Sequence, residues 1–322
     1  MSLLTLGKGV GRARSAADFG KVAVLLGGDS TEREISLLSG NAVLAALIRR
    51  GVDAHAFDPL DRPVQNLVSD AFDRAWIALH GPGGEDGTMQ GALEWLGVPY
   101  TGSGVLASAL TMDKLKTKRV VVGAGYAAPE YAVLSSAADL QHALAHVGLP
   151  LMVKPASQGS SVGMTKVKSA AELPGAYAEA RAVDPIVFAE RFIAGDEYTV
   201  GVLGTQGLPS IRIQPATEFY DYQAKYFRND TQYHCPSGLE PQAEAELQAA
   251  TLAAFQVTDC HGWGRVDFMR DRATDKFYFI EINTTPGMTD HSLVPMAARQ
   301  SGIDFDELVW RVLETSFVRL RK

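Results

Sequence analysis

An unbroken apolar run that follows Lys21 and ends at Leu26, directly before two glycines, constrains the fold of this chain more than any other stretch. Such a run is typical of a strand in a parallel sheet, because helices cover both faces of that kind of sheet. Thr31 and Glu34 then match a capping box at the start of a helix. Two more short strands are expected at Val52–Phe57 and Ala75–Leu79. Strand, helix and strand in this order predict a doubly wound α/β domain at residues 20–103.

After about residue 103 the expected strands come in pairs that look antiparallel. These pairs are Leu151–Pro155 with Gly163–Val167, Glu197–Leu203 with Leu208–Gln214, and Arg265–Arg270 with Lys276–Asn283. Helices are expected at 240–260 and 304–320, and residues 1–19 are interpreted as a loosely attached extension. The chain therefore combines a parallel α/β part with a later part built on antiparallel sheets.

The charge balance and the cysteine content limit the class of function. The 322 residues include 30 Lys and Arg against 37 Asp and Glu, a net charge of −7. A broad nucleic-acid-binding surface needs a basic excess and is disfavoured, although a local basic pocket for a phosphate ligand is allowed. Cys235 and Cys260 make neither a disulfide framework nor a zinc spacing, which favours a reducing, cytoplasmic compartment. No apolar run approaches the roughly 18 residues of a membrane span, so no membrane contact is expected.

The stretch Lys154–Gly163 is a candidate phosphate-binding element. A strand ends in a lysine, and a small, hydroxyl-rich loop returns into another strand. Backbone N–H groups of such a loop can point at phosphate oxygens while Lys154 supplies a positive charge. It is not a Walker A loop, because that string is absent and a strand follows in place of a helix. From these residues alone, a plain surface hairpin is the alternative.

Two expected strands carry a polar pattern with a period of two. Arg265 and Asp267 share one face of their strand, as Glu281 and Asn283 do on the next. If the strands pair, one face gathers two carboxylates, a carboxamide and a guanidinium. Hard oxygen ligands suit Mg²⁺, which takes few protein ligands and keeps positions for substrate phosphates. A solvated sheet face with cross-strand ion pairs is the equal alternative.

Two loops of the first domain leave its strands at the same edge of the sheet. Ligands of open α/β sheets lie beyond the carboxyl ends of the strands. The loops Gly27–Glu34 and His80–Gly91 therefore offer Glu32 and His80 to one cleft. Taken singly, Glu32 also fits a first-turn helix carboxylate, and His80 also fits a hydrogen-bonded loop histidine.

A short linker separates two carboxylates in the stretch Phe188–Glu197. An apolar strand ends in Glu190, and Glu197 follows the linker. This arrangement fits a hinge that contacts a nucleotide base and ribose. An ordinary strand connection is the alternative.

Taken together, these stretches resemble the D-alanine–D-alanine ligases of the ATP-grasp superfamily. The matching strings run in order across nearly the whole chain from residue 20: Val24–Ser36, His80–Gly91, Met112–Lys114, Lys154–Met164, Tyr220–Tyr226, Gly262–Asp267 and Glu281–Leu293. Any one string could arise by chance, whereas the ordered set is specific. The first 19 residues have no counterpart in this resemblance.

The resemblance implies three domains after the extension at 1–19. They are an α/β substrate domain at 20–103, a central ATP-grasp domain at 104–193, and a C-terminal ATP-grasp domain at 194–322 with a lid loop at 215–238. ATP would lie between the last two, gripped by antiparallel sheets. The family joins two D-alanines, through an acyl phosphate, into the dipeptide that ends the peptidoglycan stem peptide. A homodimer is implied as well.

The resemblance also implies roles for single residues at positions that match the family's motifs. The implied catalytic residues are Glu32, Ser160, Tyr226, Arg265 and Gly287. The implied D-alanine contacts are His80, Lys225, Ser292 and Leu293. The implied ATP contacts are Lys114, Lys154, Glu190, Arg191, Ile193 and Glu197. Two Mg²⁺ or Mn²⁺ ions would be held by Asp267, Glu281 and Asn283.

Two positions depart from the family's commonest strings: Gln158, where an acidic residue is frequent, and Arg191, where lysine is frequent. Arginine does not reproduce the point contact of lysine, so the adenine contact at Arg191 is the weakest implication. D-Lactate or D-serine as the second substrate is an alternative, against which Tyr226 favours D-alanine. An ATP-binding module without turnover predicts loss of Arg265 or of a metal-binding acid, and all are present. A nicotinamide oxidoreductase is disfavoured, because Gly-Gly-Asp-Ser replaces G-x-G-x-x-G after the first strand.

Overall fold

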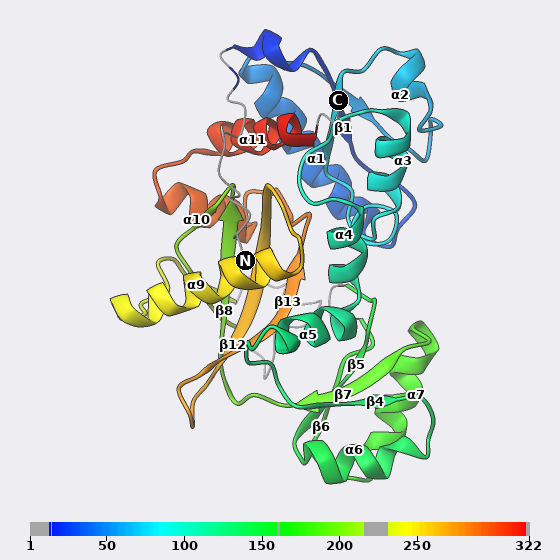
Figure 1. Ribbon diagram of the computed structural model, residues 1–322, viewed down its shortest axis with the longest axis vertical. Coiled ribbons are helices and arrows are strands. Elements are labelled where there is room, and N and C mark those ends of the chain that lie inside the picture. Colours follow the sequence, from blue (N-terminus) through cyan, green and yellow to red (C-terminus); the bar gives the residue numbers. More distant parts are fainter. Residues whose placement is uncertain (1–12, 14, 160–161, 216–230, 320–322) are drawn as a thin grey trace, which may run out of the picture.

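The computed structural model describes residue 13 and residues 15–159, 162–215 and 231–319 (Figure 1). Within these residues the strands form three sheets, one parallel and two antiparallel. No helix in the described part of the chain is both long and apolar enough to cross a membrane. The predicted site residues Ser160, Lys225 and Tyr226, with most of the loop 215–238, lie outside the described residues.

The first sheet is parallel and has the strand order β2-β1-β3. Its strands are β1 (Lys21–Leu25), β2 (Asp53–Phe57) and β3 (Arg74–Ile77), and the helices after them are α1 (Arg33–Arg49), α2 (Asn66–Ser69) and α3 (Thr88–Leu96). β1 is buried after its first residue, as the apolar run predicted. The predicted capping box is wrong, because α1 is capped at Glu32 without a side-chain bond. The turn is instead closed by Ser30, whose Oγ accepts the N–H of Glu32 at 3.2 Å.

The other two sheets are antiparallel and confirm the predicted strand pairs. The four-stranded sheet, in the order β4-β7-β5-β6, consists of β4 (Tyr131–Leu134), β5 (Leu151–Pro155), β6 (Thr165–Val167) and β7 (Val187–Arg191). The six-stranded sheet, in the order β11-β10-β8-β12-β13 with β9 beside β8, consists of β8 (Gly195–Leu203), β9 (Gln206–Gly207), β10 (Ile211–Gln214), β11 (Gln232–His234), β12 (Trp263–Asp271) and β13 (Phe277–Asn283). The registers place Leu151 opposite Val167, Thr199 opposite Ile211, and Asp267 opposite Glu281.

Helices connect the three sheets and cover them (Figure 1). The four-stranded sheet carries α6 (Asp139–Val147) and α7 (Leu173–Val183), while α4 (Val105–Met112) and α5 (Lys114–Gly123) pack against β13. The other described helices are η1 (Ala16–Phe19), α9 (Pro241–Val257), α10 (Leu293–Gln300), α11 (Phe305–Glu314) and η2 (Thr315–Arg319). At the start of α5, the N–H of Lys114 donates to the carbonyl of Ala156 at 2.8 Å. This bond joins α5 to the loop that leaves β5.

One apolar core unites the first sheet with helices from the far end of the chain. Val22 and Val24 of β1 share it with residues of α1, α10 and α11, and α11 lies beside α1 (Figure 1). The expectation of a loosely attached extension does not hold for Phe19, which is fully buried. Its ring packs edge-on against Trp310 and stacks on Phe317. The aromatic cluster therefore fixes the segment that leads into β1.

Candidate active site

A cavity of about 910 Å³ lies where α1, α5 and the loops that follow β3 and β13 meet. The predicted site residues that line it are Glu32, His80, Lys114, Arg265, Glu281, Asn283, Gly287, Ser292 and Leu293. Residues far apart in the sequence and predicted for catalysis, for D-alanine, for ATP and for metal thus share one space. A smaller hollow of about 530 Å³ beside β2 contains none of the predicted residues.

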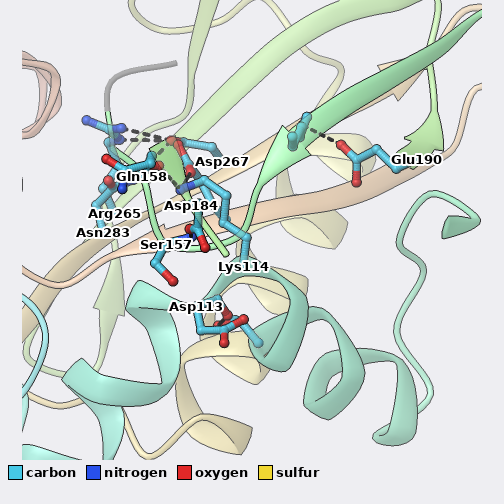
Figure 2. A network of polar contacts seen from close by, with 12 residues as sticks. Asp113, Lys114, Ser157, Gln158, Asp184, Glu190, Arg265, Asp267 and Asn283 are labelled. Carbon is cyan, nitrogen blue, oxygen red and sulfur yellow. Dashed lines mark hydrogen bonds and ion pairs between the residues drawn. The ribbon is translucent and has the colours of Figure 1, made fainter. Parts of the chain in front are cut away.

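The strand pair β12 and β13 gathers the predicted polar side chains on one face (Figure 2). Arg265 donates from Nε and Nη2 to the two oxygens of Asp267, at 2.9 and 2.8 Å. The same carboxylate accepts from Asn283 Nδ2 at 3.1 Å and from Thr199 Oγ1 at 2.6 Å. Glu281 lies directly across the strand pair from Asp267. Because Asp267 is only 4% exposed, these bonds hold its carboxylate and the Arg265 guanidinium in fixed orientations.

The oxygen donors of this face fit a small, hard cation. Among the described residues, no group of three or more His, Cys, Asp or Glu is arranged to hold a metal ion. The strand pair offers two carboxylates, Asp267 and Glu281, and the carboxamide of Asn283. Mg²⁺ and Mn²⁺ accept such oxygen ligands, and Mg²⁺ completes its shell with water and substrate phosphates. The donor set is therefore compatible with the predicted metals.

Lys114 connects the polar face of β12 and β13 to the Lys154–Gly163 loop. Its Nζ lies 3.1 Å from the Glu281 carboxylate and donates to the backbone carbonyl of Gln158 at 2.8 Å (Figure 2). The side chain of Gln158 turns the other way and donates to the carbonyl of Val183 at 3.0 Å. The contact with Lys114 thus uses the backbone, so an acidic side chain at position 158 is not needed for it.

Two glycines make room for the Glu32 carboxylate. A Cβ at Gly81 would lie 2.8 Å from Oε2 of Glu32, and one at Gly159 would lie 3.1 Å from the same atom. Gly81 also has a φ of +70°, which favours glycine. The carboxylate therefore touches both the His80–Gly91 loop and the Lys154–Gly163 loop.

His80 supports the loop that follows β13. It is 6% exposed, and its Nε2 lies 3.2 Å from the Oγ of Ser39 on α1. That Oγ also accepts the N–H of Met288 at 3.1 Å. Burial lowers the pKa of His80, although the negative charge of Glu32 opposes this shift. The lowered pKa favours the neutral imidazole. His80 and Met288, the residue after Gly287, therefore both lie within hydrogen-bond distance of the Ser39 hydroxyl.

Ser292 organises the same loop from its far end. Its Oγ accepts the N–H of Thr289 at 2.8 Å, and a Cβ at Gly287 would lie 3.0 Å from that oxygen. Leu293 begins α10 and is 7% exposed. The loop consequently approaches Ser292 closely at Gly287, where only glycine fits without displacing the neighbour.

The ATP-contacting residues predicted at β5 and β7 meet in a buried ion cluster. Glu190 pairs with Lys154 through one carboxylate oxygen and with Lys118 through the other, the latter at 2.9 Å. Sequence reasoning missed Lys118. A usable signal was present, because Lys118 follows Lys114 by four residues and so shares its helix face.

Arg191 joins the two antiparallel sheets. Its guanidinium bonds to Glu130, just before β4, at 2.6 Å and to Asp271, at the end of β12, at 3.2 Å. It also lies over the ring of Tyr278 on β13.

The two other predicted nucleoside contacts follow Arg191 in the chain. Ile193, which is 3% exposed, lies in the linker to β8. Glu197 lies within β8, opposite Met269 of β12 and Ile213 of β10. These contacts do not test nucleoside binding, so the adenosine-binding roles of Arg191, Ile193 and Glu197 stay predictions.

Glu85 is a cavity residue that sequence reasoning also missed. It belongs to the His80–Gly91 loop and lines the cavity. Its carboxylate accepts the N–H of Gly81 at 2.8 Å. Burial, reinforced by the charge of Glu32, raises the pKa of the Glu85 carboxyl to about 8. A carboxyl that keeps its proton near neutral pH removes one negative charge from beside Glu32.

We expect the variant Glu85→Gln to change how stability depends on pH. The folded pKa of about 8 exceeds the ordinary 4.5, so between these values the folded state keeps a proton that the unfolded state loses. The wild type therefore loses stability as pH rises through this window, and glutamine does not. The stability of E85Q relative to the wild type should increase on the order of 1–3 kcal/mol between about pH 5 and pH 8.5. Urea unfolding at both pH values measures this. An equal difference at both, or the same trend in the exposed control Glu246→Gln, would contradict it.

Comparisons with known proteins identify the family. The family model described as D-ala D-ala ligase C-terminus matches residues 120–314, and the one described as D-ala D-ala ligase N-terminus matches residues 55–103. A D-alanine–D-alanine ligase of Dechloromonas aromatica is 57% identical over 298 residues, which cover 92% of this chain and 98% of that protein.

Solved structures give the same result for the fold. The D-alanine–D-alanine ligase of Bacillus anthracis matches with a TM-score of 0.81 at 34% identity, covering 92% of this chain and 97% of that one. Its complex with ATP matches with a TM-score of 0.81 at 32% identity over the same shares. The VanG D-Ala:D-Ser ligase of Enterococcus faecalis matches with a TM-score of 0.79 at 28% identity, covering 92% and 99%. The chain therefore belongs to the D-alanine–D-alanine ligase family, with the ATP-grasp fold that the ordered sequence strings predicted.

Proposed function

We propose that this chain joins two D-alanine molecules into D-alanyl-D-alanine, with conversion of ATP to ADP, for peptidoglycan precursor synthesis. Family membership supports this reaction. The observation that carries it is the convergence of Glu32, Arg265 and Lys114 on one cavity. A carboxylate suits a substrate ammonium, a guanidinium suits a developing oxyanion, and a lysine suits a phosphate.

The chemistry requires activation, because a carboxylate is a poor electrophile. In the first step, a carboxylate oxygen of the first D-alanine attacks the γ-phosphorus of ATP. The bond from that phosphorus to the ADP oxygen breaks, which gives D-alanyl phosphate and ADP. In the second step, the amine of the second D-alanine attacks the acyl carbon and loses a proton. Phosphate then leaves the tetrahedral intermediate, and the dipeptide is formed.

The first D-alanine is held by side chains on both walls of the cavity. Glu32 binds its ammonium, with His80 close to the same subsite. Arg265 and the N–H of Gly287 face the oxygen that becomes negative in the second step. Such donors are most effective when fixed in advance. The two bonds from Arg265 to Asp267 support that requirement.

ATP is bound between the two antiparallel sheets. Lys114 and Lys154 neutralise its phosphates, and the nucleoside contacts are Glu190, Arg191, Ile193 and Glu197. Asp267, Glu281 and Asn283 would hold two Mg²⁺ or Mn²⁺ ions, which when bound neutralise further phosphate charge. The hard oxygen donors of this strand pair support that assignment.

The second D-alanine and the lid complete the proposal. Lys225, Ser292 and Leu293 form the second subsite. Ser160, Glu32 and Tyr226 form a hydrogen-bonded trio that ties the loop 215–238 over the cavity. Exclusion of water there protects the acyl phosphate from hydrolysis. The positions of Ser292 and Leu293 in the cavity lining support the second subsite.

The proposed domains are 20–103, 104–193 and 194–322, after the extension at 1–19. Each of the three sheets falls within one of these domains, which supports the division. We further propose that the enzyme acts in the cytoplasm as a homodimer, without a nucleic-acid or membrane partner. The substrates are two D-alanine molecules and one ATP.

Release of ADP in the presence of ATP, Mg²⁺ and D-alanine tests the proposed function. We expect turnover that depends on D-alanine, with the dipeptide identified by mass and L-alanine inactive as the control. D-Lactate and D-serine, added in competition across pH, test the second subsite. Preferential depsipeptide formation near neutral pH, or preferential use of D-serine, would contradict D-alanine as the second substrate. ATP binding without turnover of any acceptor would contradict a ligase.

A further inference from the structure

A buried lysine that is absent from the predicted site lies next to the ATP-contacting residues. Lys118 of α5 is 1% exposed, Glu190 of β7 is 2% exposed, and Lys154 at the end of β5 is 6% exposed. The Nζ of Lys118 lies 2.9 Å from Oε2 of Glu190, while Lys154 pairs with Oε1. Each oxygen of the Glu190 carboxylate (Figure 2) is therefore paired with a different lysine.

Two lysines share one carboxylate in a group shielded from water. Burial lowers the pKa of Lys118, and the negative charge of Glu190 opposes that shift, so the charged form of Lys118 depends on Glu190. With both lysines protonated, the group holds two cations for one anion. Burial alone would raise the pKa of Glu190, but the two lysines lower it to about 2, so this carboxyl is ionised at neutral pH. A buried charge without a counter-charge is costly. The cluster is thus suited to the arrival of one more anionic group.

The position of the two lysines decides which one meets that anion. Lys154 begins the Lys154–Gly163 loop, the candidate phosphate-binding element. Lys118 lies on α5, one helical turn beyond Lys114, which itself contacts that loop at Gln158. When Lys154 turns to a phosphate, Glu190 keeps Lys118 as its counter-charge. If Lys118 were missing, the same movement would leave a buried carboxylate without a cation.

We propose that Lys118 is a positioning residue for the nucleotide: it holds Glu190 so that Lys154 is free to bind the phosphates. This inference rests on the proposed function, because it takes ATP as the ligand of the loop. It assigns Lys118 no contact with ATP or with the reacting atoms. Lys118 acts through Glu190 and Lys154 alone.

The test measures ATP binding directly, by calorimetry with Mg²⁺ and without D-alanine, in addition to steady-state kinetics. We expect Lys118→Met to weaken ATP binding at least about ten-fold and to raise the KM for ATP by a similar factor. The KM for D-alanine should change less than about two-fold. Lys118→Arg should recover most of the affinity, because it restores a cation. The matched control Lys116→Met, on the exposed side of the same helix, should bind ATP as the wild type does.

A double-mutant cycle separates positioning from a loss of folding. In a Glu190→Gln background no carboxylate charge remains to be balanced, so adding Lys118→Met should weaken ATP binding less than about two-fold. If Lys118→Met alone fails to fold, the step from Glu190→Gln to the double variant can still be measured, and a loss of ATP binding greater than about two-fold in that step would overturn the inference. Thermal unfolding without nucleotide identifies that case.

The outcomes distinguish this inference from the proposed function. If the wild type fails to bind ATP, the proposed function itself is overturned. If the wild type binds ATP and Lys118→Met binds it equally well, the positioning role is overturned. Equal losses from Lys118→Met in the wild-type background and in the Glu190→Gln background would also overturn it. So would equal rises in the KM for ATP and the KM for D-alanine.

Discussion

Replacing Glu281 by glutamine is expected to abolish ligation, with a fall in kcat of at least about 1000-fold. Glutamine keeps the shape of the side chain and removes its charge. The face shared with Asp267 then offers a metal ion one carboxylate fewer. Lys114, whose Nζ lies 3.1 Å from Glu281, also loses its ion pair. Both losses act on the groups proposed to neutralise the phosphates.

The measurement for Glu281→Gln is ADP release together with dipeptide yield, followed over a range of Mg²⁺ concentrations. The matched control is Asp275→Asn in the turn of the same strand pair, where the carboxylate is 75% exposed and pairs with Arg270. We expect this control to retain activity within about two-fold, because exposed ion pairs contribute little. Activity of Glu281→Gln within about ten-fold of the wild type would remove Glu281 from the metal-binding set.

The second large effect is expected at Arg265. Substitution by lysine should lower kcat about 100- to 1000-fold, the usual cost of removing one oxyanion donor. Lysine keeps the positive charge beside Asp267 but cannot reproduce the planar fork, so it cannot serve Asp267 and a substrate oxygen in the same geometry. ATP binding should stay within a few-fold of the wild type, because the nucleotide contacts lie elsewhere in the proposal.

Single-turnover kinetics check the Arg265→Lys prediction by separating the two chemical steps. We expect dipeptide formation to slow more than acyl phosphate formation, since the oxyanion develops in the second step. Arg270→Lys, on the same strand and paired with the exposed Asp275, is the control. An unchanged second step in Arg265→Lys would assign the oxyanion to other donors.

The parts of the fold that the sequence predicts are those whose signal is local. The apolar run that ends at Leu26 predicts a strand covered on both faces, and the residues of β1 after Lys21 are buried. The period of two at Arg265 and Asp267 predicts a shared face, which the register with Glu281 and Asn283 confirms. Backbone geometry sets this alternation, which holds from Arg265 to Asp267, whereas an irregularity directly after Asp267 shifts the register of the pair. The capping box failed because Ser30, one residue before Thr31, closes the turn instead.

The parts that the sequence did not predict depend on packing between distant elements. Lys118 and Glu190 meet only because α5 packs against β13 and also shares a small core with β7 through Leu115 and Phe188. Phe19 stands in no periodic pattern, and its burial depends on Trp310 and Phe317, which come almost 300 positions later. Glu85 belongs to a loop that the sequence predicts to face a cleft, and the loop does line the cavity. Its raised pKa, however, arises from its surroundings in the fold. Charge and burial of this kind are properties of the assembled molecule.

The shared core of β1, α1 and α11 has a consequence for how the chain is made. A ribosome adds about 5–20 residues per second, so roughly 13 to 51 s separate the completion of α1 from the synthesis of α11. Throughout that interval β1 and α1 lack the part of their shared core that α11 supplies. The ion pair of Arg50 with Glu307, at 2.8 Å, is also unmade, although it anchors the helix that begins beside Glu32. The first domain to be translated is thus among the last to be finished, and its apolar face is open to molecular chaperones until then.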